Sequence, residues 1–321
     1  MKVPGNPRAG YVVVSLDVGE AGFVDFLIDS GATTALISPK MREMLGDSAT
    51  DGAAIRGLGA MGETVRQKVT IEGASVGSKS LGKLDAVVTD IQASGLPAVI
   101  GGLLGLEFLS KFEVEFDFVN KALKFHPPGS IACGALDVSE LVEIPMSTHP
   151  TGLKTVRCRL NGCEPPFPAI VDMGSFFSVA NWMAAAAGGV GPDSPDVKQS
   201  AMQAVGIDGR AMPMATAKFD LEVVGVHGSD GSDDSDGSDG SNGGGLVSEY
   251  KGQCCIGDLP AFASLSAQTI PFMSMGLDVI GRGRTVFVVS DDRVFLTPGQ
   301  GEGGMYAEED VRQGPMPPPS R

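Results

Sequence analysis

Two aspartates follow short apolar runs in the same way, one in each half of the chain. The first run is Phe26-Leu27-Ile28, followed by Asp29-Ser30-Gly31-Ala32, and the second is Ala169-Ile170-Val171, followed by Asp172-Met173-Gly174-Ser175. Two such turns facing each other would bring two carboxylates together, and close carboxylates that share one proton can work as an acid and a base. The pattern therefore predicts acid–base hydrolysis.

The similarity between the halves extends beyond the two turns. Gly105-Leu106-Glu107-Phe108-Leu109 corresponds to Gly276-Leu277-Asp278-Val279-Ile280, and both segments lead, over the same distance, into a strand-like run ending near Phe125 and Leu296. Matched spacings of this kind indicate a duplicated unit.

The second unit is longer than the first because of one segment. From Asp172 to Gly276 there are 104 positions, against 76 from Asp29 to Gly105, and residues 228–245 account for much of the excess. This segment contains only Gly, Ser, Asp and Asn, which predicts a solvated surface loop inserted in the second unit. Its alternating Asp residues could instead offer oxygen ligands to calcium, although the closing Glu of a helix-loop-helix calcium loop is missing.

Composition narrows the range of partners. The chain has 321 residues, of which 42% are hydrophobic, enough for two lobes each with a core, and its formal net charge is -15. A strongly acidic chain without a basic run is not expected to bind nucleic acid or an anionic membrane surface.

No apolar run approaches the ~20 residues of a membrane-spanning helix. The three histidines lack metal-ligand spacing, and we expect neither a metal nor a cofactor.

The cysteines favour a reducing compartment. There are five, an odd number, and none forms a Cys-x-x-Cys pair. An intracellular location is therefore favoured. If an N-terminal transit peptide is missing from the sequence, the expected location is an organelle such as a plastid.

The residue patterns predict a mainly β protein with short helices. In the first unit we expect a hairpin over 11–28, a short helix over 39–45 with Ser38 as its N-cap, strands over 65–71 and 84–91, and a glycine hairpin at Gly57, Gly59 and Gly62. In the second we expect strands over 153–160 and 167–171, a helix over 181–187 and a hairpin at 206–209. The predicted organisation is a first lobe at 1–127, a linker at 128–143, a second lobe at 144–299 and a disordered tail at 300–321.

These motifs resemble those of the retropepsin-like and pepsin-like aspartic proteases. The resemblance rests on Asp29-Ser30-Gly31-Ala32 with Leu103-Leu104-Gly105 in the first lobe, and on Asp172-Met173-Gly174-Ser175 with Ser274-Met275-Gly276 in the second. It covers about residues 10 to 297. It implies two homologous acid-protease-like β-barrel lobes, with an active site at their interface.

The resemblance also implies roles for individual residues. Asp29 and Asp172 would activate a water that attacks a peptide bond, and Gly31 and Gly174 would let the two turns approach. Ser30 could donate a hydrogen bond across the interface, and Ser175 could donate one to Asp172. Ala32 and Met173 complete the two supporting turns. The hairpin of Gly57, Gly59 and Gly62 would be a flap that closes over a peptide or unfolded protein substrate. Because both turns lie in one chain, a monomer is sufficient.

Three departures from the family pattern have different implications. The glycine hairpin contains no tyrosine, which favours the retropepsin-like branch, and Ser274 interrupts an apolar pair. Met173 stands where a Thr or Ser is usual, and it leaves a second hypothesis open. The alternative is a catalytically inactive module that binds peptides or proteins in the same cleft. An Asp before a Gly can also be simply a turn residue that accepts backbone hydrogen bonds.

Overall fold

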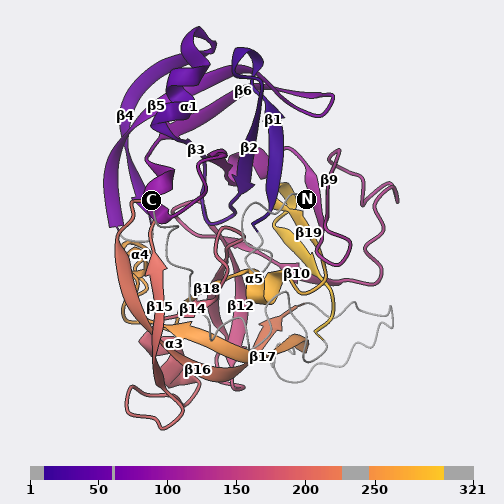
Figure 1. Cartoon of the computed structure of the whole chain (residues 1–321). Helices are drawn as coiled ribbons and strands as arrows, with labels where there is room; N and C mark the ends of the chain where they lie inside the picture. The colour runs from indigo at the N-terminus through magenta and orange to yellow at the C-terminus, as the bar shows by residue number, and fades with distance from the viewer. Residues whose placement is uncertain (1–10, 60–61, 226–245, 300–321) are drawn as a thin grey trace.

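Two lobes of β-strands lie one above the other in the computed structural model (Figure 1). The structure describes residues 11–59, 62–225 and 246–299. The predicted acidic loop at 228–245 and the predicted tail at 300–321 lie outside these residues. Within them the fold is mainly β with short helices, as the sequence predicts.

The first lobe is a sheet of seven strands that closes on itself. Its order is β1-β2-β7-β3-β6-β5-β4, with a further pairing of β1 to β5. The strands are β1 (Val13–Asp17), β2 (Phe23–Ile28), β3 (Ala35–Ile37), β4 (Ala49–Gly59), β5 (Gly62–Val76), β6 (Lys79–Val88) and β7 (Ile100–Leu104). The helices are α1 (Pro39–Leu45) and α2 (Leu106–Leu109), with 3-10 turns η1 (Gly19–Ala21), η2 (Gly46–Ser48) and η3 (Ile91–Ser94).

The second lobe repeats this order with one strand added at the edge. Its sheet runs β11-β12-β13-β18-β14-β17-β16-β15, and β12 pairs with β16 as β1 pairs with β5. The strands are β11 (Ser147–Thr148), β12 (Lys154–Leu160), β13 (Phe167–Val171), β14 (Val179–Ala180), β15 (Lys198–Val205), β16 (Ala211–Val224), β17 (Leu246–Ile256) and β18 (Met273–Met275). The helices are α3 (Trp182–Ala187), α4 (Pro260–Ser264) and α5 (Leu277–Ile280).

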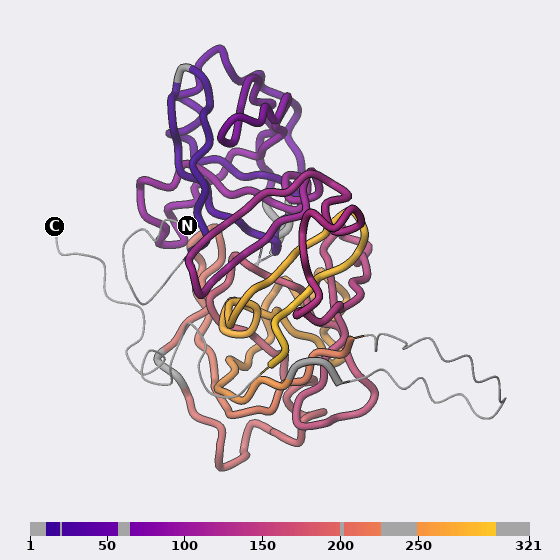
Figure 2. Tube along the Cα trace, turned by 90° about the vertical axis from the view of Figure 1, so that its right-hand side faces the viewer, coloured from indigo at the N-terminus to yellow at the C-terminus, as the bar shows by residue number. Residues whose placement is uncertain are grey.

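A third sheet contains strands from both lobes. Its order is β10-β20-β19-β8-β9, and Figure 2 shows its yellow C-terminal strands beside the magenta strands of the first lobe. The strands are β8 (Glu113–Asp117), β9 (Ala122–His126), β10 (Val142–Pro145), β19 (Arg284–Val288) and β20 (Arg293–Leu296), with the 3-10 turn η4 (Val289–Asp291) before β20. Glu115 pairs with Val286 in antiparallel register. Because these residues lie equally far beyond Gly105 and Gly276, the axis that relates the lobes passes through this pair.

The first helix of each lobe begins at a polar N-cap. Ser38 accepts a hydrogen bond from the Met41 N–H (3.0 Å) before α1, as predicted. Asn181 accepts one from the Ala184 N–H (2.8 Å), so α3 begins one residue later than the sequence predicts. An N-cap residue has extended backbone angles and so precedes the helix it caps.

Each lobe extends a long hairpin toward the other. The β4–β5 hairpin of the first lobe contacts α4 of the second. At the tip of the β15–β16 hairpin, Gly209 faces the Ala93 carbonyl of η3, and Ile207 packs on an apolar cluster of the first lobe that includes Leu27 and Leu103. The two hairpins therefore bridge the lobes on the side of the Asp turns. None of the helices in the described ranges is long and apolar enough to span a membrane.

Candidate active site

Asp29 directly follows β2, and its turn is held by backbone hydrogen bonds. β2 runs parallel to β7, and the Asp29 N–H donates to the Leu104 carbonyl at 2.9 Å. The Gly31 N–H donates to Asp29 Oδ1, also at 2.9 Å. The apolar strand therefore delivers a half-buried carboxylate to a fixed position.

Asp172 has the same backbone partners in the second lobe. β13 runs parallel to β18, and the Asp172 N–H donates to the Met275 carbonyl at 2.9 Å. The Gly174 N–H donates to Asp172 Oδ1 at 3.0 Å. The duplicated sequence motif thus produces a duplicated turn.

The two turns face each other, and each glycine lies against the opposite carboxylate. A Cβ atom on Gly31 would lie only 2.6 Å from Asp172 Oδ1, and one on Gly174 would overlap Asp29 Oδ1. At contacts this short, a side chain on either glycine would push against the opposite carboxylate. The structure therefore brings together Asp29 and Asp172, as the spacing of the two motifs led us to expect.

Ser30 joins the two turns from one side. Its Oγ donates to the Val171 carbonyl (2.7 Å) and accepts from the Met173 N–H (2.9 Å), and the side chain is fully buried. Met173 is also fully buried but has no hydroxyl to return the bond. The cross-lobe connection therefore has the one-sided form expected from the sequence.

The expected bond from Ser175 to Asp172 is absent, and Ser274 makes one instead. Ser175 Oγ donates to the Phe177 carbonyl (2.8 Å) within its own loop, so the prediction for Ser175 is wrong. Ser274 Oγ donates to Asp172 Oδ2 at 2.9 Å. Ser274 lies opposite Ile170 in the parallel β13–β18 pair, which places it beside Asp172, the residue that follows β13. The sequence marked Ser274 only as a polar residue in an apolar position.

Burial and mutual repulsion raise the pKa of the Asp29 carboxyl to about 7. Burial is the larger cause and the Asp172 charge the second, while the N–H groups of Gly31 and Ala32 oppose them. Burial also raises the pKa of Asp172, against hydrogen bonds from Ser274 and from the N–H groups of Gly174 and Ser175. Near neutral pH the pair can therefore hold one proton between two carboxylates.

The glycine hairpin is the connection between β4 and β5. Gly59 pairs with Gly62 and Gly57 pairs with Thr64, while residues 60–61 lie outside the described part of the chain. The ladder is therefore paired up to its last described residues.

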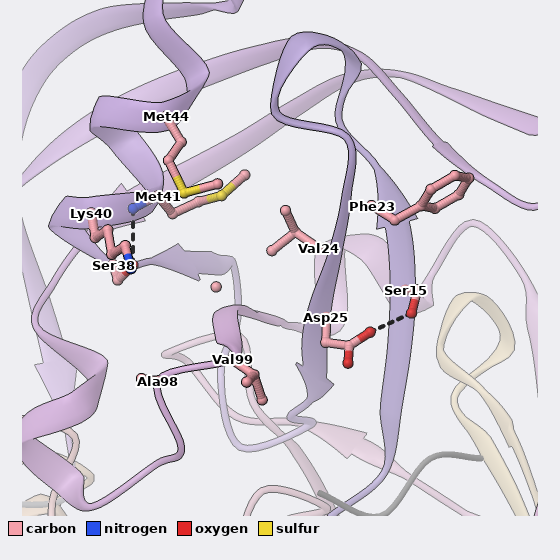
Figure 3. Close-up of a pocket in the computed structure, with 11 residues that line it drawn as sticks. Ser15, Phe23, Val24, Asp25, Ser38, Lys40, Met41, Met44, Ala98 and Val99 are labelled. Atoms are coloured by element: carbon pink, nitrogen blue, oxygen red, sulfur yellow. Dashed lines mark hydrogen bonds between the residues drawn. The ribbon is translucent and has the colours of Figure 1, made fainter.

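A cavity of about 370 Å³ lies elsewhere on the first lobe (Figure 3). It is lined by β1, β2 and the start of α1, and it includes Asp25, which accepts a hydrogen bond from Ser15. Phe23 at its rim is 78% exposed. Neither Asp29 nor Asp172 lines this cavity, so its chemistry is separate from that of the two turns.

The strand order and the facing Asp turns define a two-lobed acid-protease-like fold. Residues 14–108 match the family model described as aspartyl protease, which confirms the resemblance seen in the sequence. Among solved structures, the chain is similar to basic 7S globulin from soybean, with 11% sequence identity and a TM-score of 0.44. That similarity covers 89% of this chain and 94% of the globulin chain. No curated protein matches the chain.

Proposed function

We propose that this protein is an aspartic-type endopeptidase that hydrolyses peptide bonds with Asp29 and Asp172. The observation that carries the proposal is the mutual approach of the two turns, in which each carboxylate lies against the glycine of the other turn. The raised pKa of Asp29, to about 7, supports a pair that carries one proton and one negative charge under mild conditions.

The chemistry follows from sharing one proton. The ionised carboxylate takes a proton from a water as the water oxygen bonds to the peptide carbonyl carbon, and the protonated carboxyl gives its proton to the carbonyl oxygen. The product of this step is a neutral gem-diol. In the second step the nitrogen of the gem-diol takes the proton held by the pair, one gem-diol hydroxyl returns its proton to the pair, the C–N bond breaks, and a carboxylic acid and an amine leave.

The surrounding elements suit an extended peptide or an unfolded protein as substrate. The β4–β5 hairpin would be the flap, with Gly57, Gly59 and Gly62 at or near its tip, and closing it would exclude bulk water from the reacting atoms. Because one chain supplies both turns, a monomer would be the active form. Ala32 and Ser175 would support the turns through their backbone, since the Leu106 and Leu277 N–H groups donate to their carbonyl oxygens (2.8 and 2.9 Å).

A second candidate function is a binding module that uses the same cleft without cleaving its ligand. Met173 favours it, because the buried thioether cannot return the hydrogen bond that Ser30 makes. Without a returned hydrogen bond from position 173, the two turns are held together less firmly. Catalysis is sensitive to small errors in the position of the reacting groups.

The test is cleavage of an unfolded protein between pH 3 and 8 by wild type and by the variants Asp29→Asn and Asp172→Asn. We expect wild type alone to cleave, to be inhibited by a statine-type transition-state analogue, and to lose activity as the pH rises past about 7, where Asp29 ionises. Cleavage by both variants would contradict the assignment. A folded wild type that binds the statine peptide but cuts nothing would favour the binding module.

A further inference from the structure

Ser274 makes the surroundings of Asp172 different from those of Asp29, although the backbone around the two aspartates is the same. Its side chain is 7% exposed, and its Oγ donates to Asp172 Oδ2 at 2.9 Å. It lies next to Met275, whose carbonyl accepts the Asp172 N–H, so the same short strand holds both the backbone and the carboxylate of this residue. Hydrogen bonds to an ionised carboxylate favour the ionised form.

The corresponding position in the first lobe is Leu103. It pairs with Leu27 in the parallel β2–β7 ladder and precedes Leu104, whose carbonyl accepts the Asp29 N–H. Leu103 is 3% exposed and has no donor. Asp29 therefore has the backbone donors of its turn but lacks the side-chain donor that Asp172 has.

The other charged groups near the pair are engaged with partners of their own. On the helices behind the turns, Glu107 accepts from Thr34 (3.2 Å) and Asp278 accepts from Ser178 (2.7 Å). On the two hairpins, Asp208 forms an ion pair with Arg210 (2.6 Å) and also attracts Arg66. The charge that raises the pKa of Asp29 is that of Asp172. The balance between the two carboxyls is therefore set by their mutual repulsion, their burial and their hydrogen-bond donors.

We propose that Ser274 is a positioning residue that holds Asp172 as the ionised member of the pair, so that Asp29 carries the shared proton. This inference rests on the proposed function for its catalytic meaning. It assigns a direction to the first step: Asp172 takes the proton of the water, and Asp29 protonates the carbonyl oxygen. Charge is conserved, because Asp29 becomes ionised as Asp172 becomes protonated.

The test compares Ser274→Ala with Ser274→Thr, which keeps a hydroxyl. The proton affinity of the pair is read by NMR titration of ¹³C-labelled aspartate carboxyls, with Asp29→Asn and Asp172→Asn to assign the signals. We expect Ser274→Ala to raise the lower apparent pKa of the pair by about one unit, and Ser274→Thr to restore most of the wild-type value. Ser38→Ala, which removes the hydroxyl that caps α1, is the control for loss of a buried serine and should leave both signals in place.

In activity, Ser274→Ala should move the acidic limb of the kcat/KM profile to higher pH by the same amount and lower kcat more than it raises KM. Unchanged carboxyl titrations in Ser274→Ala would overturn the inference even if the protein cleaves peptides. A shifted titration in a protein that cleaves nothing would support the role of Ser274 and contradict the proposed function. If Ser274→Ala does not fold, a wild-type titration in which Asp29 ionises before Asp172 is enough to overturn the inference.

Discussion

The two lobes have the same backbone around their aspartates but different side chains. In each, the Asp N–H donates to a carbonyl of the neighbouring parallel strand at 2.9 Å, and a glycine N–H two residues on donates to the carboxylate. The hydroxyls, in contrast, are distributed unequally. The first lobe has the buried cross-lobe hydroxyl of Ser30 where the second lobe has Met173, and the second lobe has Ser274 where the first has Leu103.

This difference shows what a duplicated fold preserves. Backbone hydrogen bonds follow from strand order and register, so they persist in both lobes while side chains diverge. Two lobes with the same backbone hydrogen bonds can then give two carboxyls unequal environments. In an acid–base pair, that inequality is useful because the two groups must do opposite tasks.

The largest expected effect concerns the part that the lobes share. Gly31→Ala and Gly174→Ala should each lower kcat/KM by about a hundredfold or more, because the new Cβ would push against the opposite carboxylate. Gly191→Ala is the control, since its Cβ would come no closer than 3.9 Å to a neighbour. If only one of the two glycine variants lowered kcat/KM strongly, the two turns would not be equivalent in catalysis.

The next effect concerns the one-sided connection. Ser30→Ala should lower the free energy of unfolding by about 1–3 kcal/mol, because two buried backbone groups lose their shared partner. The matched variant is Ser175→Ala. The Ser175 hydroxyl bonds within its own loop, so its loss should lower the free energy of unfolding by less than about 1 kcal/mol. Urea denaturation measures both. Equal losses would mean that Ser30 does not connect the lobes.

A third prediction uses the raised pKa of Asp29. Because the folded protein holds a proton that the unfolded chain releases, stability should fall as the pH rises from about 4 to about 7. Asp29→Asn removes this dependence and should unfold a few degrees higher than wild type at pH 8, but not at pH 3.

Asp117→Asn is the control of opposite sign. Hydrogen bonds from Asn120 (2.8 and 2.7 Å) lower the pKa of Asp117, so this carboxyl should stabilise the fold above about pH 4. The variant should therefore unfold at a lower temperature than wild type at pH 8. If Asp29→Asn and Asp117→Asn shifted the unfolding temperature in the same direction, the account of Asp29 would be wrong.

The smallest effect should come from making the lobes more alike. Met173→Ser provides a hydroxyl that could complete the reciprocal bond, and we expect kcat to rise a few-fold. It also removes a fully buried Met side chain, so stability should fall by about 2–5 kcal/mol. Peptide cleavage and thermal unfolding measured on one preparation separate the two effects. A fall in kcat would show that the one-sided connection already gives the better geometry.

Local signals identified much of the architecture. The apolar strands, the capped helix α1, the glycine hairpin and the two Asp turns could be predicted because each depends on residues close together in the chain. The helix after Asn181 was misplaced by one residue, since a cap and the first helical residue differ only in backbone angles. The hydroxyl partner of Asp172 was misassigned because Ser175 is near it in sequence, whereas Ser274 is near it across a parallel strand pair.

The amino-acid sequence alone determined that the chain is duplicated, mainly β, and has two aspartates at equivalent turns. These properties are contained in spacing, apolar periodicity and the glycines that follow each aspartate. Only the tertiary structure decided that each glycine lies against the opposite carboxylate, that Ser30 joins the lobes, and that Ser274 rather than Ser175 bonds to Asp172. The physical reason is that hydrogen bonds and pKa values depend on distances of a few ångströms between residues far apart in the chain, which strand register and lobe packing set.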